Sequence, residues 1–547
     1  MISNPRLRPV GIGHSFFEFI GEFCLDEKEN RSINRAFHRL CTLMRKMDAK
    51  TAIIEDIAPT YSDMNAESTA ITTYYGKDIE IKAYRFTFVS EEITSLKSIQ
   101  KLDPGAFLSS AIIVNFKLPD GNNWKSYLYS AIVAIPKISN HKKYGSVPLL
   151  NNYLHIYKTF PCEVSIADGE IFRFNLTGTF FCQQNSVTSV CAHASLCMTI
   201  NNMNLEGVGI ISPESINKII EVDHKSVKFS PYPGKEGLSK DEILSVLKKY
   251  GLTLTWSDFF ENPNVEYNDY IYKYIESQCP VLLVFSTAGT SAHIVPILGH
   301  TLNSDMWRPE AEPAYAESGN RLNYKPASAW VDHFIIHDDN FGMYFCLPVE
   351  ALKRVTLPKY DPAFRAHFAV VVIPSGVTTP AWEAEWASIV IVKHILQLSA
   401  NSAPIDKWSD RILTSDPARR PIIVRTLLTE KDAYLKSLTQ KDFEGNEFTE
   451  QDKTELIKDL PERFWLSEIT LPDLYTANKT KIVDFFYKAD CPTLAKEEDI
   501  FERWLQVRFP YALLKRNKDG SASMVQMSIK SHYPLLRLER EHDILDW

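Results

Sequence analysis

The apolar residues of this chain fall into short runs separated by polar and turn-forming residues. Three of the strongest runs cover residues 281–285, 368–373 and 389–392. Runs of this length suit buried strands or parts of packed helices, whereas a membrane-spanning helix needs about 20 apolar residues. The pattern therefore predicts a soluble globular protein. Its 547 residues exceed what one hydrophobic core usually organises, so we expect two or three domains.

Residues 1–160 have the pattern of an α+β region. Residues 32–47 place apolar side chains at spacings of three and four, which is typical of an amphipathic helix. Short apolar runs bounded by turn signals predict strands at residues 84–89, 111–116 and 127–135. No residue pattern in this region indicates what it does.

Residues 359–547 are predicted to form a mixed α/β region. We expect a strand at residues 368–373 and helices at residues 382–398, 417–438 and 472–489. This region also lacks a motif that points to a chemical reaction.

Charge and cysteine content exclude several classes of function. The 60 Lys and Arg residues are interspersed with 68 Asp and Glu residues, for a formal net charge of −8, so the chain lacks the basic face that nucleic acid requires. Nine cysteines occur without a CxxC pair, which disfavours a zinc ribbon or a thioredoxin-type motif. An odd cysteine count without an export signal predicts reduced thiols in a cytoplasmic protein that does not bind membranes. We expect no cofactor and no metal.

Residues 161–358 hold the arrangement with chemical meaning. A strand-like run over residues 171–181 leads through the polar residues Gln183, Gln184 and Asn185 into a helical run that contains Cys191 near its start. The N-terminus of a helix stabilises a thiolate through its free N–H groups and its dipole, and a nearby imidazole takes the proton. A cysteine between apolar residues is otherwise usually a core residue, so its context decides.

The elements that follow Cys191 provide that context. Ser239 is placed to cap the N-terminus of a helix, a second helix runs into a buried strand that starts after Pro280, and His293 lies near the start of the next strand. These elements are expected at residues 240–250, 267–277, 280–285 and 292–298, with a further strand at residues 334–336.

This order of elements resembles the papain-like cysteine peptidase superfamily, and within it the branch of peptidases that remove double-glycine leaders from bacteriocins. In that branch a loop containing Gln, a helix headed by Cys, a strand beginning with His and a later Asp occur in this order. The resemblance covers about a third of the chain, roughly residues 183–348. It implies an α+β fold whose Cys-headed helix packs on an antiparallel sheet, flanked here by N- and C-terminal α/β regions.

Carried over by position, the resemblance implies a catalytic triad. Cys191 matches the nucleophile, His293 the base, and Asp338 the carboxylate that orients the imidazole. Asp339 stays open as the alternative to Asp338, because the register cannot be fixed to one residue. The family Asp is commonly followed by Pro and soon by Gly, and here Gly342 is present but the Pro is not.

The resemblance also implies a side-chain donor to the oxyanion. The family Gln usually lies six residues before the nucleophile, where this chain has Asn185, and Gln184 lies seven before it. We prefer Gln184 with one extra loop residue, keep Asn185 as the alternative, and expect the backbone N–H of Cys191 as the second donor. One such donor contributes about 3 kcal/mol of transition-state stabilisation.

Other histidines compete with His293. His300 lies seven residues farther along the same expected strand, and residues an odd number apart face opposite sides, so only one of the two can face the thiol. His193 lies on the expected nucleophile helix and points away from the thiol. His333 and His337, with the two aspartates, are candidate metal ligands, but their spacing matches no familiar zinc site.

The segment between His293 and Asp338 is longer than a tight hairpin needs. It contains four large aromatic residues, Trp307, Tyr315, Tyr324 and Trp330. Long loops in compact domains are often lids or binding loops. We expect this insertion either to shape substrate access or to pack on the surface.

The sequence therefore predicts a cytoplasmic cysteine peptidase that cleaves peptide or isopeptide bonds in peptide or protein substrates through an acyl-enzyme. Thiol acyl transfer or deamidation on protein substrates is the alternative chemistry. A non-catalytic papain-like binding module is the alternative from a different class. From their size, we expect the flanking regions to recognise a regulatory protein partner or to hold the peptidase inactive.

Overall fold

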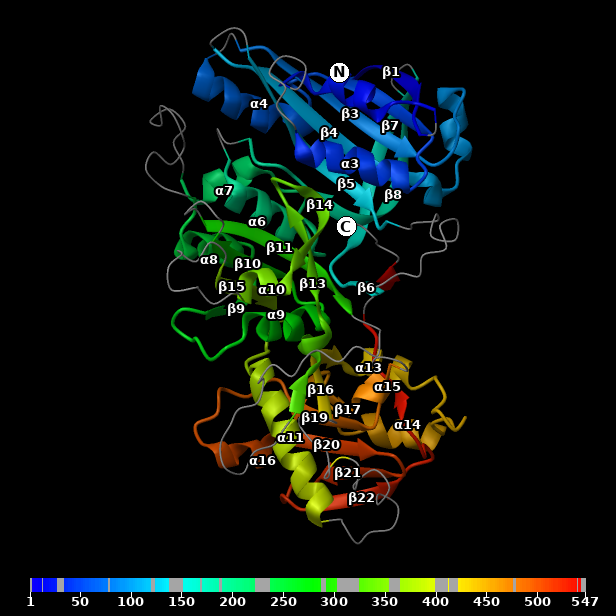
Figure 1. Cartoon of the computed structure of the whole chain (residues 1–547), viewed down its shortest axis with the longest axis vertical. Helices are drawn as coiled ribbons and strands as arrows, with labels where there is room; N and C mark the ends of the chain where they lie inside the picture. The colour runs from blue at the N-terminus through cyan, green and yellow to red at the C-terminus, as the bar shows by residue number, and fades with distance from the viewer. Residues whose placement is uncertain are drawn as a thin grey trace.

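Three large β-sheets with helices packed against them divide the described protein into an N-terminal, a central and a C-terminal region (Figure 1), and β18 and β23 form a small two-stranded sheet. The structure is a computed structural model. It describes residues 2–542 except 12, 27–33, 77–78, 120–122, 137–150, 168–169, 186–188, 222–236, 287–291, 303–323, 354–364, 399–411, 413–421, 476–478 and 539. Helices and mostly antiparallel strands together make this an α+β protein, as the sequence predicts.

The N-terminal sheet has the strand order β1-β2-β3-β4-β5-β8-β7. Helix α3 begins after Asn34, whose side chain accepts a hydrogen bond from the N–H of Phe37, and its apolar face packs on Phe86 of the sheet. The elements are β1 (Ile2–Pro9), α1 (Phe16–Phe23), α3 (Arg35–Lys46), β2 (Thr51–Ile57), α4 (Ser62–Tyr75), β3 (Ile81–Val89), η1 (Leu96–Lys101), η2 (Pro104–Ala106), β4 (Phe107–Lys117), β5 (Trp124–Ala134), β7 (Lys158–Ala167) and β8 (Glu170–Phe181).

The central sheet has the order β14-β13-β11-β10-β15-β9, and β6 pairs with both β11 and β24. Helix α8 begins at the predicted cap, where the N–H of Ser239 donates to Glu242 Oε2 at 2.7 Å. The elements are β6 (Asn151–Leu154), α6 (Cys191–Asn201), α7 (Pro213–Ile219), α8 (Lys240–Lys249), β9 (Thr253–Asp258), α9 (Tyr267–Glu276), β10 (Val281–Ser286), β11 (Ala292–Leu302), β13 (His333–Asp338), β14 (Gly342–Pro348), α10 (Val349–Lys353), β15 (Arg365–Ile373) and β24 (Arg540–His542).

The C-terminal sheet has the order β12-β16-β17-β19-β20-β21-β22. Among the described residues, the pairing of β12 with β16 is parallel, and the other strand pairs are antiparallel. The elements are β12 (Tyr324–Pro326), η3 (Ala327–Trp330), α11 (Ala381–Leu398), β16 (Ile422–Glu430), α13 (Lys431–Ser437), α14 (Glu450–Ile457), β17 (Arg463–Thr470), α15 (Pro472–Tyr475), β18 (Thr480–Lys481), β19 (Val483–Lys488), η4 (Glu497–Asp499), α16 (Ile500–Arg503), β20 (Trp504–Phe509), β21 (Ala512–Arg516), β22 (Ala522–Gln526) and β23 (Tyr533–Pro534).

Two helices predicted in the C-terminal region are wrong. Of the described residues within 417–438, Ile422–Glu430 form strand β16, and only those of α13 are helical. Residues 472–489 contain the single turn α15 and then strand β19. Both strands are buried on nearly every residue, so they lack the polar alternation that marks a half-exposed strand. An apolar run of this kind cannot be told from a buried helix by periodicity alone.

Strand pairing crosses the sequence-based boundaries between residues 1–160, 161–358 and 359–547. Strands β7 and β8 belong to the N-terminal sheet, so that sheet extends to Phe181. Strands β6 and β24 pair with each other beside the central sheet (Figure 1). The three regions are therefore not three consecutive stretches of chain.

The end of the long insertion packs on the C-terminal region. The hydroxyl of Tyr324 donates to Glu385 Oε1 of α11 at 2.9 Å. The rings of Trp330 and Tyr475 pack edge-to-face, with their centroids 5.5 Å apart. Trp307 and Tyr315 lie outside the described residues.

In the parts of the chain that the structure describes, no helix combines the length and the apolar character needed to cross a membrane.

Strand β11 continues past residue 298, where the sequence pattern predicts its end. Gly299 makes this continuation possible, because a Cβ at this position would lie 2.0 Å from the carbonyl oxygen of Tyr153 on β6. Only glycine permits such a close approach of two backbones.

We expect Gly299→Ala to lower the free energy of unfolding by about 1–3 kcal/mol, since the added methyl group overpacks the contact with β6. Chemical denaturation measures the change. Gly209→Ala is the matched control, because a Cβ there meets no atom within 4 Å. Equal stability of the two variants would contradict the close approach.

Candidate active site

Cys191 is the first residue of α6. The preceding Val190 is extended (φ −120°, ψ 174°), and all later residues of α6 are buried. Cys191 itself is partly exposed, and of the other cysteines in the described chain only Cys491 is not buried. Helix α6 is therefore a core helix whose first residue reaches solvent, where the N–H groups and the dipole of the helix favour a thiolate.

Helix α6 packs against the strand that carries His293. The hydroxyl of Ser195, one turn into the helix, donates to the carbonyl oxygen of Ile294 on β11 at 2.7 Å. This contact fixes the start of the helix beside the start of β11. Cys191 and His293, far apart in sequence, are thereby brought together.

The His293 side chain lies between the thiol and a carboxylate. Its interaction with the Cys191 side chain contributes to raising its pKa, and its Nε2 lies 3.1 Å from Oδ2 of Asp338. Since Nε2 faces Asp338, Nδ1 is the ring nitrogen left for the thiol. The residue is only 8% exposed, so these contacts occur in a largely dry environment where they are stronger than in water.

The surroundings of His293 favour its charged form. Burial lowers the pKa of His293, but hydrogen bonds to Asp338 and Cys191 and the charges of Asp338 and Asp339 outweigh burial and raise the pKa to about 11. The imidazole is therefore protonated at neutral pH. A cation beside Cys191 stabilises a thiolate, which is the nucleophilic form of cysteine.

Asp338 and Asp339 differ in how they meet His293. Asp338 contacts Nε2 at 3.1 Å, and its Oδ1 accepts from the N–H groups of Asn340 and Phe341 at 2.8 and 3.1 Å, which fixes the carboxylate. Asp339 Oδ1 lies farther from Nε2, at 3.6 Å. Burial raises the pKa of Asp339 to about 7. The geometry favours Asp338 as the residue that orients the imidazole.

The two candidate oxyanion donors differ in their contacts. Gln184 is partly exposed, and its Nε2 lies 3.5 Å from Oδ1 of Asn340, in the turn that follows the two aspartates. Asn185 is buried and exchanges hydrogen bonds with Ser189, while its Nδ2 donates to Glu67 Oε1 at 2.7 Å. Gln184 thus lies next to the turn that carries the two aspartates. Asn185, in contrast, is bonded to Ser189 and Glu67 and holds the loop before Cys191 in place.

The competing histidines have partners elsewhere. His300 Nε2 lies 2.9 Å from Glu276 Oε1, and His193 Nε2 lies 2.8 Å from Asn217 Oδ1. His337 Nε2 lies 2.9 Å from Thr179 Oγ1, and His333 begins β13 opposite Pro348. The structure therefore separates these histidines from the His293 site.

Two clusters of described residues have ligand atoms within 4.8 Å of one another, as a metal site requires: His293 with Asp338 and Asp339, and His155 with Glu276 and His300. A cation at the first cluster would compete with the proton on His293. At the second, the guanidinium of Arg425 already contacts Glu276 at 3.1 Å and opposes another cation.

The sequence patterns miss the residues of the N-terminal region that support the site. Glu67 of α4 accepts from Asn185 and from the hydroxyl of Tyr127, at 2.7 and 2.6 Å. Arg39 of α3 donates to the carbonyl oxygens of Met343 and Tyr344, just after the aspartate turn, at 3.0 and 2.8 Å. These contacts span 60, 118, 304 and 305 residues, and no local signal marks them.

Comparison with protein-family models and with the sequences of curated proteins gave no match. The interpretation of the site therefore depends on its geometry.

We expect Asp338→Asn to lower the pKa of His293 more than Asp339→Asn does, because Asp338 contributes both a hydrogen bond and a charge. In the wild type the ring loses its proton only as pH approaches about 11, and the substitution moves this step to lower pH. Since the folded-state pKa exceeds the ordinary value of 6.5, the stability that this ring contributes is complete below pH 6.5 and is lost toward pH 11.

Nuclear magnetic resonance of ¹³C-labelled histidine rings measures the titration, with His293→Ala to assign the signal. A larger shift in Asp339→Asn than in Asp338→Asn would transfer the orienting role to Asp339.

Proposed function

We propose that this protein is a cysteine peptidase of the papain-like type, with Cys191, His293 and Asp338 as its triad and peptides or proteins as its substrates. The observation that carries the proposal is that Cys191, at the start of a helix, interacts with a His293 ring that Asp338 holds. The packing of α6 on β11 of an antiparallel sheet further supports a papain-like arrangement.

In the acylation step, Sγ of Cys191 attacks the carbonyl carbon of the scissile amide as a thiolate. The new C–S bond places negative charge on the carbonyl oxygen. When this tetrahedral intermediate collapses, the C–N bond breaks and the amine leaves with the proton that the His293 imidazolium supplies. Asp338 keeps Nε2 engaged, so that the other ring nitrogen stays directed at the reacting atoms.

In the deacylation step, neutral His293 takes a proton from water as the water oxygen attacks the thioester. The C–S bond breaks, the carboxylic acid product leaves, and the thiolate and imidazolium are restored. In both steps Gln184 donates its amide N–H to the oxyanion, with the backbone N–H of Cys191 as the second donor.

We expect an iodoacetamide probe to label Cys191 faster than the other eight cysteines near neutral pH. His293→Ala is expected to slow this labelling on the order of 10²-fold, because Cys191 loses the imidazolium that stabilises its thiolate. Mass spectrometry identifies the labelled residue, and Cys191→Ala removes the signal.

Cys491→Ala is the matched control, since Cys491 is also partly exposed but has no such histidine contact among the described residues. We expect this variant to leave the labelling of Cys191 unchanged. Indiscriminate labelling that ignores His293 would replace the proposal with a non-catalytic binding module.

We expect Gln184→Ala to slow the acylation of Cys191 by p-nitrophenyl acetate by about 10²-fold, since one donor to the oxyanion is lost. The labelling of Cys191 by iodoacetamide should not change in Gln184→Ala, because that reaction creates no oxyanion. Stopped-flow absorbance at the p-nitrophenolate band measures acylation. If Asn185→Ala slows acylation at unchanged stability while Gln184→Ala does not, Asn185 is the donor.

A further inference from the structure

A pocket of about 330 Å³ lies between the N-terminal sheet and the helices α4 and α7. Its volume falls within the range of small-molecule sites, about 300–1,000 Å³. Neither Cys191 nor His293 is among the described residues that line it. The pocket is thus separate from the candidate catalytic residues, and the inference drawn from it does not depend on the proposed function.

The floor of the pocket alternates isoleucine and serine side chains on one face of the sheet. Ile112 of β4 lies opposite Ser130 of β5, and Ser110 of β4 lies opposite Ile132 of β5. Residues two apart on a strand face the same side of the sheet, so all four side chains share one face. The two serines are therefore diagonal neighbours, about 7 Å apart, with an isoleucine beside each of them.

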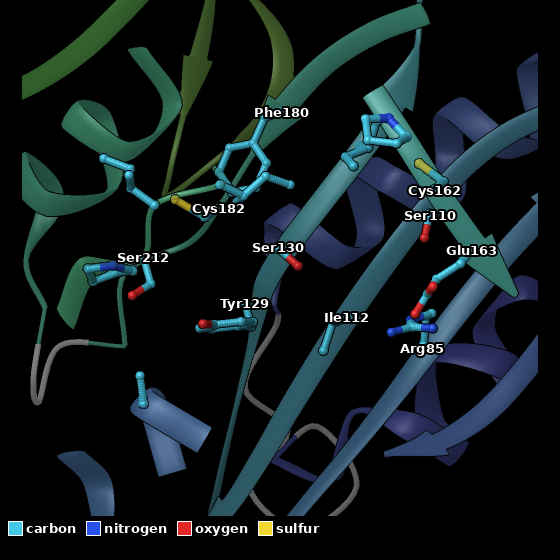
Figure 2. Close-up of a pocket in the computed structure, with 16 residues that line it drawn as sticks. Arg85, Ser110, Ile112, Tyr129, Ser130, Cys162, Glu163, Phe180, Cys182 and Ser212 are labelled. Atoms are coloured by element: carbon cyan, nitrogen blue, oxygen red, sulfur yellow. The ribbon is translucent and has the colours of Figure 1, made fainter. Parts of the chain in front are cut away.

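The two serine hydroxyls on this floor are available to a ligand. Both serines are half-buried, and neither hydroxyl has a hydrogen-bond partner among the described residues. Figure 2 shows Ser110 and Ser130 on neighbouring strands, with the rings of Phe180 and Tyr129 to one side. Water occupies such hydroxyls in the free protein, and a ligand that reproduces its hydrogen bonds can displace it.

The apolar part of the pocket has a fixed shape. Ile132 lies opposite Phe180 of β8, so the apolar floor continues onto a third strand. In the facing wall, the backbone of Ile211 exchanges two hydrogen bonds with the side chain of Asn201 on α6, at 2.8 and 2.9 Å. A pocket whose walls are held in this way costs little ordering when a ligand binds.

The charged groups at the other end of the pocket are already paired within the protein. Arg85 forms a buried ion pair with Glu55 at 3.8 Å. One oxygen of Glu163 accepts from the hydroxyl of Tyr61 at 2.8 Å, and the other lies 4.0 Å from Nε of Arg173. A charged ligand would lose its hydration without gaining a free counter-ion from these groups. The pocket therefore favours an uncharged ligand.

We propose that this pocket binds an uncharged ring compound that carries two hydroxyl groups on opposite sides of the ring. Each ligand hydroxyl bonds to one of Ser110 and Ser130. The ring lies on Ile112 and Ile132, beside Phe180. Substituents on opposite carbons of a six-membered ring, one of them extended by a methylene group, match the separation of the serines. Such a ligand buries apolar area while both of its ends stay hydrogen-bonded.

Titration of the full-length protein with 4-hydroxybenzyl alcohol, followed by saturation-transfer NMR of the ligand signals, tests the proposal. p-Cresol lacks one hydroxyl, 4-hydroxybenzoate carries a negative charge, and 4-hydroxybenzylamine carries a positive charge. We expect 4-hydroxybenzyl alcohol to bind, p-cresol to bind about 5-fold more weakly, and each charged analogue to bind at least about 10-fold more weakly. Absence of binding by 4-hydroxybenzyl alcohol would overturn the proposal, as would analogues that bind as tightly as it does.

Three variants locate the binding. Ser110→Ala and Ser130→Ala each remove one hydroxyl from the floor and are expected to weaken the affinity about 5-fold. Ser130→Phe is expected to abolish binding by filling the pocket.

Ser109→Ala is the matched control and should bind as the wild type does. Ser109 precedes Ser110 on β4, so it faces the other side of the sheet, and it is not among the residues that line the pocket. Thermal unfolding of each variant verifies that it is folded. Unchanged binding by folded Ser110→Ala and Ser130→Ala would place the ligand elsewhere and overturn the assignment.

Discussion

The ion pair between Glu276 and Arg425 is the contact on which the arrangement of the central and C-terminal regions depends. Nε of Arg425 donates to Glu276 at 3.1 Å, and Nη1 donates to Glu468 on β17 at 2.7 Å, while His300 of β11 contacts the other oxygen of Glu276. Removing one partner of such a buried pair leaves a desolvated charge and costs several kcal/mol. Strand β11 also carries His293, so the same network holds the strand on which the candidate base lies.

On its other side the candidate site depends on the N-terminal region. Glu67 fixes the loop that precedes Cys191, and Arg39 fixes the backbone that follows the aspartate turn. Gly342 lies where Arg39 passes, and a Cβ there would come within 2.7 Å of its side chain. The site therefore lies in the central region, but its two loops are held by helices α3 and α4 of the N-terminal region.

Local sequence patterns predict the elements whose signal is local. The spacing of apolar residues gives α3, the Ser239 cap gives α8, and the polar loop before a helical run identifies Cys191 as a candidate. Strands β16 and β19 are not predicted, because burial on both faces removes the polar alternation that marks a strand. Contacts such as that of Glu67 with Asn185 cannot be predicted from local patterns, because they follow from the pairing of distant strands. The choice of Asp338 over Asp339 likewise needs the position of the turn.

The pairing of β6 with β24 has a consequence for biosynthesis. Residues 151–154 are made long before residues 540–542, yet they form neighbouring strands. While the intervening chain is still being translated, one edge of β6 presents unpaired N–H and C=O groups, and such edges attract other chains. The nascent protein is thus exposed to association until residues 540–542 have been translated, because this edge can close only then.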